Sequence, residues 1–294
     1  MSTTTYHTIA LPNSVTVSYA LAGESSLPPL LLLHGFPSSS HQFRNLIPLL
    51  SSTWHVIAPD LPGFGNTTVP GDYVHTFNNM AETIGLFLDA IKQSKVTVYI
   101  FDYGAPTAFR LALKRPDVFN GIITQNGNAY EEGLGAAFWE PLQTWWKGDE
   151  KRAPIADTIQ SQALTLESTK WQYEHGTPEG LLPRIDPAAY LFDYWVNLST
   201  AEQKDVQMSL FWDYRTNVGL YPDFQRYLRE SGIPVLVVWG KGDACFLPAG
   251  AKAYEKDVKN VRVVLLDGGH FLLETHVDEV AAKINGFASA VAKA

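Results

Sequence analysis

Three residues with complementary chemistry for nucleophilic catalysis each lie shortly after an apolar segment of the chain. They are Asp102, Asp243 and His270. A carboxylate can attack an electrophilic carbon, a neutral imidazole can take a proton from water, and a second carboxylate can orient the imidazole. Catalytic triads occur in this chain order of nucleophile, acid and histidine. The sequence therefore predicts Asp102 as the nucleophile, Asp243 as the acid and His270 as the base.

The segment around Asp102 is typical of a sharp turn between a strand and a helix. An apolar run at 96–101 leads into Asp102-Tyr103-Gly104, and a helix-length segment at 104–115 follows. A nucleophile in a strand–turn–helix context, with a small residue two positions later, matches a nucleophile elbow. The alternative is that Asp102 only caps the following helix. No Gly-x-Ser-x-Gly pattern occurs in the chain, which argues against a serine nucleophile at such a turn.

Short apolar runs and helix-length segments alternate along much of the chain. Continuous apolar runs predict strands covered on both faces, and strand–helix alternation predicts a doubly wound, mostly parallel sheet of the α/β class. Residues 15–19 alternate in polarity and predict an antiparallel edge strand. The predicted buried strands are 30–33, 56–58, 96–101, 122–124, 235–239 and 261–266. The predicted helices are 43–50, 80–94, 104–115, 248–257 and 276–292.

The alternation stops between residues 127 and 230, where the chain is rich in Trp, Tyr and Leu in helical patterns. We expect a helical cap at 127–230, inserted between a first core part at 1–126 and a second at 231–294. Ligands of open α/β sheets bind beyond the carboxyl ends of the strands. The cap is therefore expected to cover the pocket.

Composition narrows the classes of partner. The chain of 294 residues has a formal net charge of −8 and a single cysteine, Cys245. This charge disfavours binding to nucleic acid or to an anionic membrane, and one cysteine excludes an intramolecular disulfide. Residues 1–10 lack the pattern of a signal peptide, and no apolar run reaches the length of a membrane span. We expect a cytoplasmic monomer or homodimer that acts on a small molecule.

No group of residues has the spacing of a metal site, and no glycine-rich phosphate loop is complete. The sequence thus predicts neither a metal nor another cofactor. Aromatic residues make up 12% of the chain. Aromatic side chains suit a large apolar substrate, although packing within the cap explains them nearly as well.

Five motifs together resemble the α/β-hydrolase superfamily, in the Asp-nucleophile branch of epoxide hydrolases and haloalkane dehalogenases. They are HGFP at 34–37, DLPGFG at 60–65, the turn at Asp102, WGKGD at 239–243 and GGHF at 268–271. The resemblance implies a hydrolase with the α/β-hydrolase fold and a helical cap. The turn departs from the branch at Ile100, where a small residue is usual, and at Phe101, where histidine is common.

The chemistry expected of such a site proceeds through an ester of Asp102. An ionised carboxylate attacks an sp³ carbon, and His270 then activates a water that attacks the ester carbonyl. The backbone N–H groups of Phe36 and Tyr103 are the candidate donors to the resulting oxyanion. His34 is counted among the substrate contacts, with bracing of the loop at 34–37 as the stronger alternative.

Two leaving groups remain open. Residues 211–217, FWDYRTN, resemble the late-cap segment in which epoxide hydrolases carry a ring-opening tyrosine, which places Tyr214 in that role. The second, early cap tyrosine of those enzymes is missing, and Trp139 lies in that region. Trp139 with Tyr214 also resembles a halide-holding pair. We rank epoxide hydrolysis first and haloalkane or haloacid dehalogenation second. A lyase or isomerase, or a ligand-binding protein on the same fold, is the remaining alternative.

Overall fold

One mixed sheet of eight strands organises the computed structural model, which describes residues 3–148 and 154–292. The strand order is β1-β2-β4-β3-β5-β6-β7-β8, and the strands from β4 to β8 in this order are parallel. The strands are β1 (Thr5–Ala10), β2 (Thr16–Ala22), β3 (Pro29–Leu33), β4 (His55–Pro59), β5 (Val96–Phe101), β6 (Phe119–Gln125), β7 (Val235–Gly240) and β8 (Val261–Leu266). The predicted fold class, a mostly parallel sheet flanked by helices, is confirmed.

The amino-terminal strands correct one expectation. The segment expected as an edge strand is β2, which is antiparallel but lies between β1 and β4. The edge is formed by β1, which the sequence did not predict. Five of the six residues of β1 are exposed, and the other, Ile9, is half-buried. A strand without a buried face has no alternating apolar pattern to indicate it.

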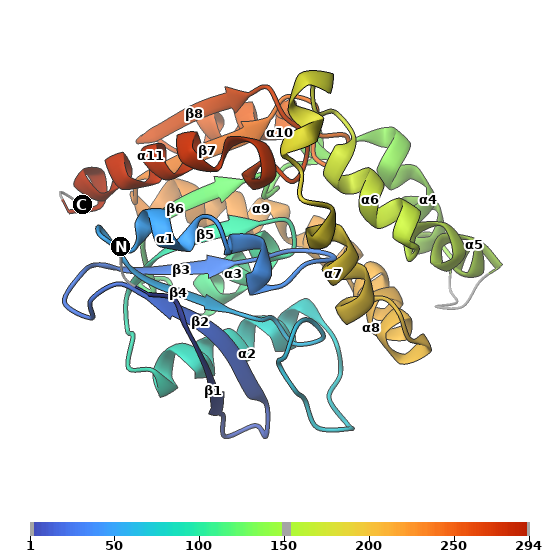
Figure 1. Ribbon diagram of the computed structural model, residues 1–294, viewed down its shortest axis with the longest axis horizontal. Coiled ribbons are helices and arrows are strands. Elements are labelled where there is room, and N and C mark those ends of the chain that lie inside the picture. Colours follow the sequence, from blue (N-terminus) through green and yellow to red (C-terminus); the bar gives the residue numbers. More distant parts are fainter. Residues whose placement is uncertain (1–2, 149–153, 293–294) are drawn as a thin grey trace.

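Helices cover both faces of the sheet (Figure 1). Side chains of α2 (Phe77–Ala90), α3 (Gly104–Lys114) and α10 (Pro248–Ala253) pack into one core cluster, and those of α1 (Ile47–Leu50) and α11 (Leu273–Val291) into the other. The strand β5 is buried throughout and contributes alternate side chains to the two clusters. Residues 43–50, predicted as one helix, are instead the end of a 3-10 turn, Ser40–Phe43, followed by α1.

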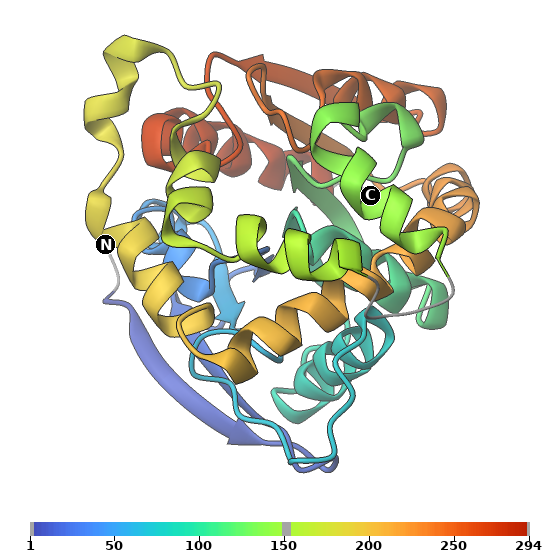
Figure 2. The same ribbon diagram turned by 90° about the vertical axis from the view of Figure 1, so that its right-hand side faces the viewer.

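A helical insertion joins β6 to β7. It contains α4 (Ala136–Trp146), α5 (Pro154–Ala163), α6 (Leu166–Glu174), α7 (Pro187–Asn197), α8 (Ala201–Asp213) and α9 (Arg215–Ser231), with 3-10 turns at Glu131–Gly133 and Glu179–Arg184. The arrows of β3 and β6 point toward this insertion in Figure 1, and Figure 2 shows α4 to α8 in front of the sheet. The insertion therefore lies beyond the carboxyl ends of the strands.

The last helix of the insertion is shared with the core. The Phe224 ring in α9 stacks on the Phe109 ring in α3, with 5.1 Å between the ring centroids. The expected cap boundary at residue 230 thus falls near the end of α9, a helix that packs against α3 of the core. The division at 126 and 230 stays a prediction.

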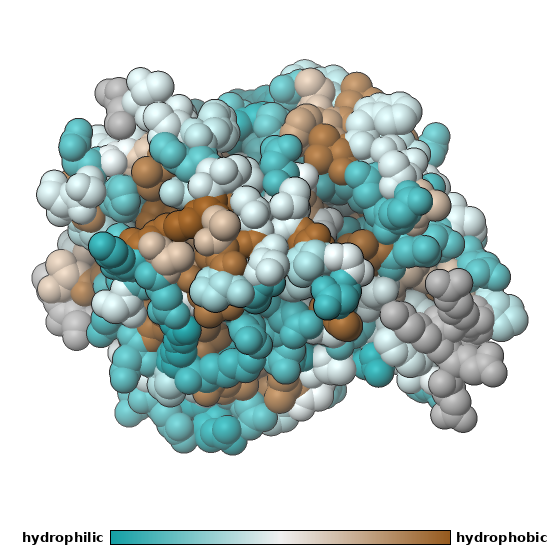
Figure 3. Space-filling view, turned by 90° about the horizontal axis from the view of Figure 1, so that it is seen from below, coloured by the Kyte–Doolittle hydropathy of each residue, from teal (hydrophilic) through white to brown (hydrophobic). Residues whose placement is uncertain are grey.

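Hydrophilic residues dominate the face seen from below, where apolar residues gather mainly left of the centre (Figure 3). Within residues 3–148 and 154–292, no helix combines the length and apolarity needed to cross a bilayer.

Candidate active site

Asp102 lies on a strained turn between β5 and α3. Its φ of 45° is in the left-handed region, which non-glycine residues seldom adopt. The turn depends on close backbone approach, because a Cβ on Gly104 would meet the Leu33 carbonyl oxygen at 2.4 Å. Ile100 does not block this turn: it is fully buried in the core cluster that includes side chains of α2 and α3.

Two backbone N–H groups point at the Asp102 carboxylate. The Phe36 amide donates to Oδ1 at 2.7 Å, and the Tyr103 amide also donates to this side chain. Burial nevertheless raises the pKa of Asp102 to about 6, against the opposing effects of His270 and the two amides. A carboxyl with this pKa is still mostly ionised at neutral pH. The two N–H groups predicted to stabilise an oxyanion thus meet at this carboxylate.

Asp243 and His270 form a buried pair. The Nδ1 atom of His270 lies 2.8 Å from Oδ2 of Asp243, and both side chains are at least 97% buried. Burial lowers the pKa of the imidazole, but the charge and hydrogen bond of Asp243, together with the charge of Asp102, outweigh it, and the pKa is raised. The Phe101 ring packs against His270 with 4.6 Å between the ring centroids. This fixes the imidazole plane from the side of β5.

An amide at the end of β6 completes the setting of Asp243, and the sequence reasoning missed its role. Asn126 Nδ2 donates to Asp243 Oδ2 at 2.6 Å. The other carboxylate oxygen accepts from the backbone N–H groups of Cys245 at 2.7 Å and Phe246 at 3.0 Å. With the imidazole, four N–H groups therefore surround this carboxylate. The signal was present in the sequence, since Asn126 lies two residues after the predicted strand 122–124.

A narrow cavity of about 20 Å³ lies at Asp102, Tyr103 and His270, three of the six sequence-predicted site residues that line it. Its volume has room for about one water molecule. The remaining lining is mostly aromatic or apolar: Phe36, Phe138, Trp139, Leu142, Gln172, Phe211, Tyr214 and Cys245. Three of these residues, Phe138, Leu142 and Phe211, also line a neighbouring cavity of about 250 Å³ between the cap helices.

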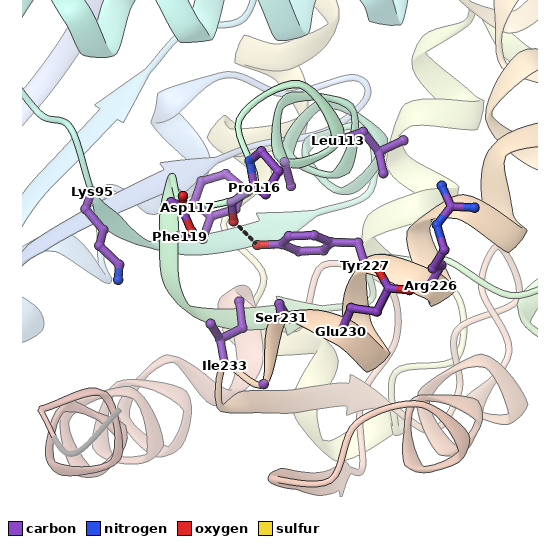
Figure 4. Close-up of a pocket in the computed structure, with 12 residues that line it drawn as sticks. Lys95, Leu113, Pro116, Asp117, Phe119, Arg226, Tyr227, Glu230, Ser231 and Ile233 are labelled. Carbon is purple, nitrogen blue, oxygen red and sulfur yellow. Dashed lines mark hydrogen bonds between the residues drawn. The ribbon is translucent and has the colours of Figure 1, made fainter.

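A larger cavity, of about 460 Å³, lies away from this chemistry. Figure 4 shows its lining from the loop at Pro116 and from the end of α9, including Tyr227, whose hydroxyl donates to the Pro116 carbonyl at 3.4 Å. Lys95, also in its lining, directly precedes β5, so this cavity lies toward the amino ends of the strands. It lacks a nucleophile paired with a histidine among its lining residues. The smaller cavity is the candidate active site.

The cap residues predicted to contact a leaving group differ in what they offer. Trp139 and Tyr214 both line the cavity, with ring centroids 4.6 Å apart. The Trp139 indole N–H, however, donates to the Cys245 carbonyl oxygen at 2.7 Å. The expectation that this N–H faces a leaving group is therefore not met in the structure, and Trp139 contributes an aromatic wall.

Tyr214 is paired with a second tyrosine that sequence reasoning missed. The hydroxyl groups of Tyr214 and Tyr221 lie 3.5 Å apart, and Asn128 Nδ2 donates to the Tyr221 hydroxyl at 3.2 Å. Tyr221 lies seven residues after Tyr214, on the same helical face. Burial, together with Tyr221, raises the pKa of Tyr214. The hydroxyl therefore stays protonated at neutral pH and is able to donate.

His34 does not line the cavity. Its Nε2 accepts from the Leu61 amide at 2.9 Å, so its Nδ1 carries the hydrogen and lies 3.1 Å from the Gly35 carbonyl oxygen. Burial lowers the pKa of His34 to about 4. The structure thus places His34 between two loops, as the bracing alternative predicts, and corrects its grouping with the substrate contacts.

Asp243, Cys245 and His270 bring three potential metal-ligand atoms within 4.8 Å of one another. The four N–H groups around Asp243 already occupy its lone pairs. Burial also raises the pKa of the Cys245 thiol, which keeps it protonated. This donor set does not fit a cation. The predicted absence of a metal stays a prediction.

Comparisons with known proteins identify the family of the chain. The family model described as alpha/beta hydrolase fold matches residues 28–277. An uncharacterized hydrolase of Saccharomyces cerevisiae is 49% identical over 95% of both chains, and a haloalkane dehalogenase of Bradyrhizobium diazoefficiens is 25% identical over 94% of this chain and 91% of that one.

Solved structures show the same fold. The haloalkane dehalogenase DbeA from Bradyrhizobium elkani superposes with a TM-score of 0.81 at 22% identity, over 99% of both chains. The epoxide hydrolase CorEH superposes with a TM-score of 0.76 at 22% identity, over 98% of this chain and 99% of that one. The chain therefore belongs to the alpha/beta hydrolase fold family, and it is a hydrolase.

Proposed function

We propose that this hydrolase converts an epoxide to a vicinal diol through a covalent ester of Asp102. The observation that carries the proposal is the meeting of three groups at one cavity. The Asp102 carboxylate accepts a hydrogen bond from the Phe36 N–H. The His270 imidazole, which is hydrogen-bonded to Asp243, lines the same cavity as Asp102. A carboxylate nucleophile suits an sp³ carbon, because the product is an alkyl ester that a base and water can hydrolyse.

In the first step, a carboxylate oxygen of Asp102 attacks an epoxide carbon. The carbon–oxygen bond of the ring breaks, and the electron pair stays on the ring oxygen. That oxygen needs a proton or a strong hydrogen bond, which a phenol can supply. Tyr214 lines the cavity and is the donor, and the Tyr221 hydroxyl lies beside it, although the early cap tyrosine of epoxide hydrolases is missing.

In the second step, His270 takes a proton from water as the water attacks the carbonyl carbon of the Asp102 ester. The oxyanion forms where the N–H groups of Phe36 and Tyr103 converge. Asp243 stabilises the imidazolium. Collapse of the tetrahedral species breaks its bond to the diol oxygen, which takes the proton from the imidazolium. The proton of the new Asp102 carboxyl replaces the one that Tyr214 gave to the ring oxygen, and one solvent oxygen is retained in Asp102.

Cleavage of a carbon–halogen bond is the second candidate, favoured by the haloalkane dehalogenases among the relatives. A departing halide needs N–H donors, and the Trp139 indole N–H is bonded to Cys245. A haloacid needs a cation, yet no Lys or Arg lines the cavity within the described part of the chain. Arg110 donates instead to Asn217 and Thr216. These contacts rank epoxide opening first.

The test is a single turnover in ¹⁸O-water with excess protein over epoxide, followed by mass analysis of the peptide that contains Asp102. Hydrolysis at the ester carbonyl introduces solvent oxygen into the carboxylate, so we expect a mass increase in that peptide. Turnover that leaves Asp102 unlabelled would overturn the covalent route. Halide release from a matched chloroalkane, measured in parallel, decides between the two leaving groups.

A further inference from the structure

One polar side chain in the candidate active site has no function in the proposed reaction. Gln172 in α6 lines the cavity and is 4% exposed. Its carboxamide makes no hydrogen bond with any residue in the ranges 3–148 and 154–292. Its amide atoms are not fully enclosed by the protein, so they are open to the cavity. Such a group in a binding cavity indicates a polar partner that arrives with the ligand.

The other polar groups of the lining are already engaged. The Trp139 N–H donates to a backbone carbonyl, and the Tyr214 hydroxyl pairs with Tyr221. The Tyr103 hydroxyl has no partner either, but surrounding atoms enclose it completely, so a ligand in the cavity cannot reach it. Apart from the reacting groups Asp102, His270 and Tyr214, and from the protonated thiol of Cys245, Gln172 is the polar side chain that a ligand can use.

The chemistry of the carboxamide defines what it binds. It offers two N–H donors and an acceptor oxygen, and it carries no charge. A hydroxyl group uses both kinds of atom, because it donates and accepts. A carboxylate would leave the carbonyl oxygen facing another acceptor, in a cavity that no described Lys or Arg lines.

The aromatic side chains that line the cavity limit the size of the substrate. Phe36 and Phe211 pack with ring centroids 5.0 Å apart, and Trp139 and Tyr214 at 4.6 Å, around a cavity of about 20 Å³. Any epoxide must displace some of these rings, and a longer chain must displace more of them. On the basis of the proposed function, we infer that the preferred substrate is a small aliphatic epoxide with a hydroxyl group near the ring, which Gln172 binds. This proposed substrate differs from the large apolar molecule that the aromatic content of the sequence suggests.

The experiment compares glycidol with 1,2-epoxybutane, which differ by a hydroxyl in place of a methyl group. The ratio of their kcat/KM values is measured for the wild type, for Gln172→Met and for Gln162→Met. Gln162 is a matched control, since it lines the neighbouring cap cavity and not the active site. We expect Gln172→Met to lower the glycidol-to-epoxybutane ratio by about tenfold, with Gln162→Met close to the wild type.

The outcomes separate the inference from the proposed function. An unchanged ratio in Gln172→Met, or an equal loss with both epoxides, overturns the role of Gln172 while leaving epoxide hydrolysis in place. Retained turnover of 1,2-epoxybutane with a selective loss of glycidol turnover supports it, because a folding defect would affect both substrates. No wild-type turnover of either epoxide overturns the proposed function, and the inference with it.

Discussion

The Phe36 amide nitrogen lies 2.7 Å from Oδ1 of Asp102, although 66 residues separate the two in the chain. This contact joins the loop after β3 to the turn after β5. It depends on Gly35, where a Cβ atom would come within 2.3 Å of the Asp102 side chain. The Phe36 N–H, which the proposed reaction needs as a donor to its oxyanion, can approach Asp102 because Gly35 has no side chain.

The first prediction concerns this contact. Gly35→Ala should displace the Phe36 N–H from Asp102 and lower kcat about 100-fold or more, as loss of an oxyanion donor does. Gly71→Ala is the control, because a Cβ there meets nothing within 4 Å. Steady-state kinetics on an epoxide, with urea unfolding of both variants, provide the measurement. Equal kinetics in the two variants would contradict this role for the loop.

The second prediction concerns the base. In His270→Gln the attack by Asp102 remains possible, but the water step loses its base, so the alkyl ester should accumulate. Mass spectrometry of the intact protein after mixing with the epoxide should show an increase equal to the mass of the substrate. The double variant with Asp102→Asn should show no adduct. Normal turnover by His270→Gln would mean that another group activates the water.

A third prediction concerns the proton donor to the ring oxygen. Tyr214→Phe removes the hydroxyl that donates to the ring oxygen in the proposed reaction and should lower the rate of epoxide opening by about 100-fold. Tyr227→Phe, beside the remote cavity of Figure 4, is the control. Pre-steady-state formation of the ester gives the rate directly. Undiminished opening by Tyr214→Phe would exclude it as the proton donor.

The fourth prediction follows from the pKa of Asp102, which burial raises to about 6. The folded state binds this proton more tightly than the unfolded state, so the contribution of Asp102 to stability decreases as pH rises from about 4 to about 6. Asp102→Asn removes this dependence. We expect the variant to exceed the wild type in unfolding free energy by about 2–3 kcal/mol at neutral pH. The difference should disappear below about pH 4 in urea unfolding curves; a constant difference would refute the pKa argument.

Strand-end motifs made much of the fold and the site predictable. Continuous apolar runs indicated the parallel strands, and Asp102, Asp243 and His270 were indicated because each lies shortly after such a run. The exposed strand β1 had no apolar pattern to indicate it. An apolar pattern in the sequence indicates which residues of a single strand or helix are buried. It therefore also indicates the residues that lie at the end of a buried strand.

Contacts made by the cap were not predictable in this way. Gln172 and Tyr221 lie on helices whose patterns indicate only that one face is buried. Which side chain reaches the cavity depends on how α6 and α9 sit over the sheet. The bond from the Trp139 indole to Cys245 likewise joins segments 106 residues apart. Such pairings follow from tertiary packing, and no spacing in the sequence reports them.

Phe138, Leu142 and Phe211 form the partition between the space at Asp102 and the wider cavity among the cap helices. Because the inner space holds about one water, every catalytic cycle must include side-chain displacement before bond formation and again when the product departs. Turnover then has a mechanical component as well as a chemical one. Increased solvent viscosity should slow product departure more than ester formation, and smaller side chains in the partition should relieve that dependence.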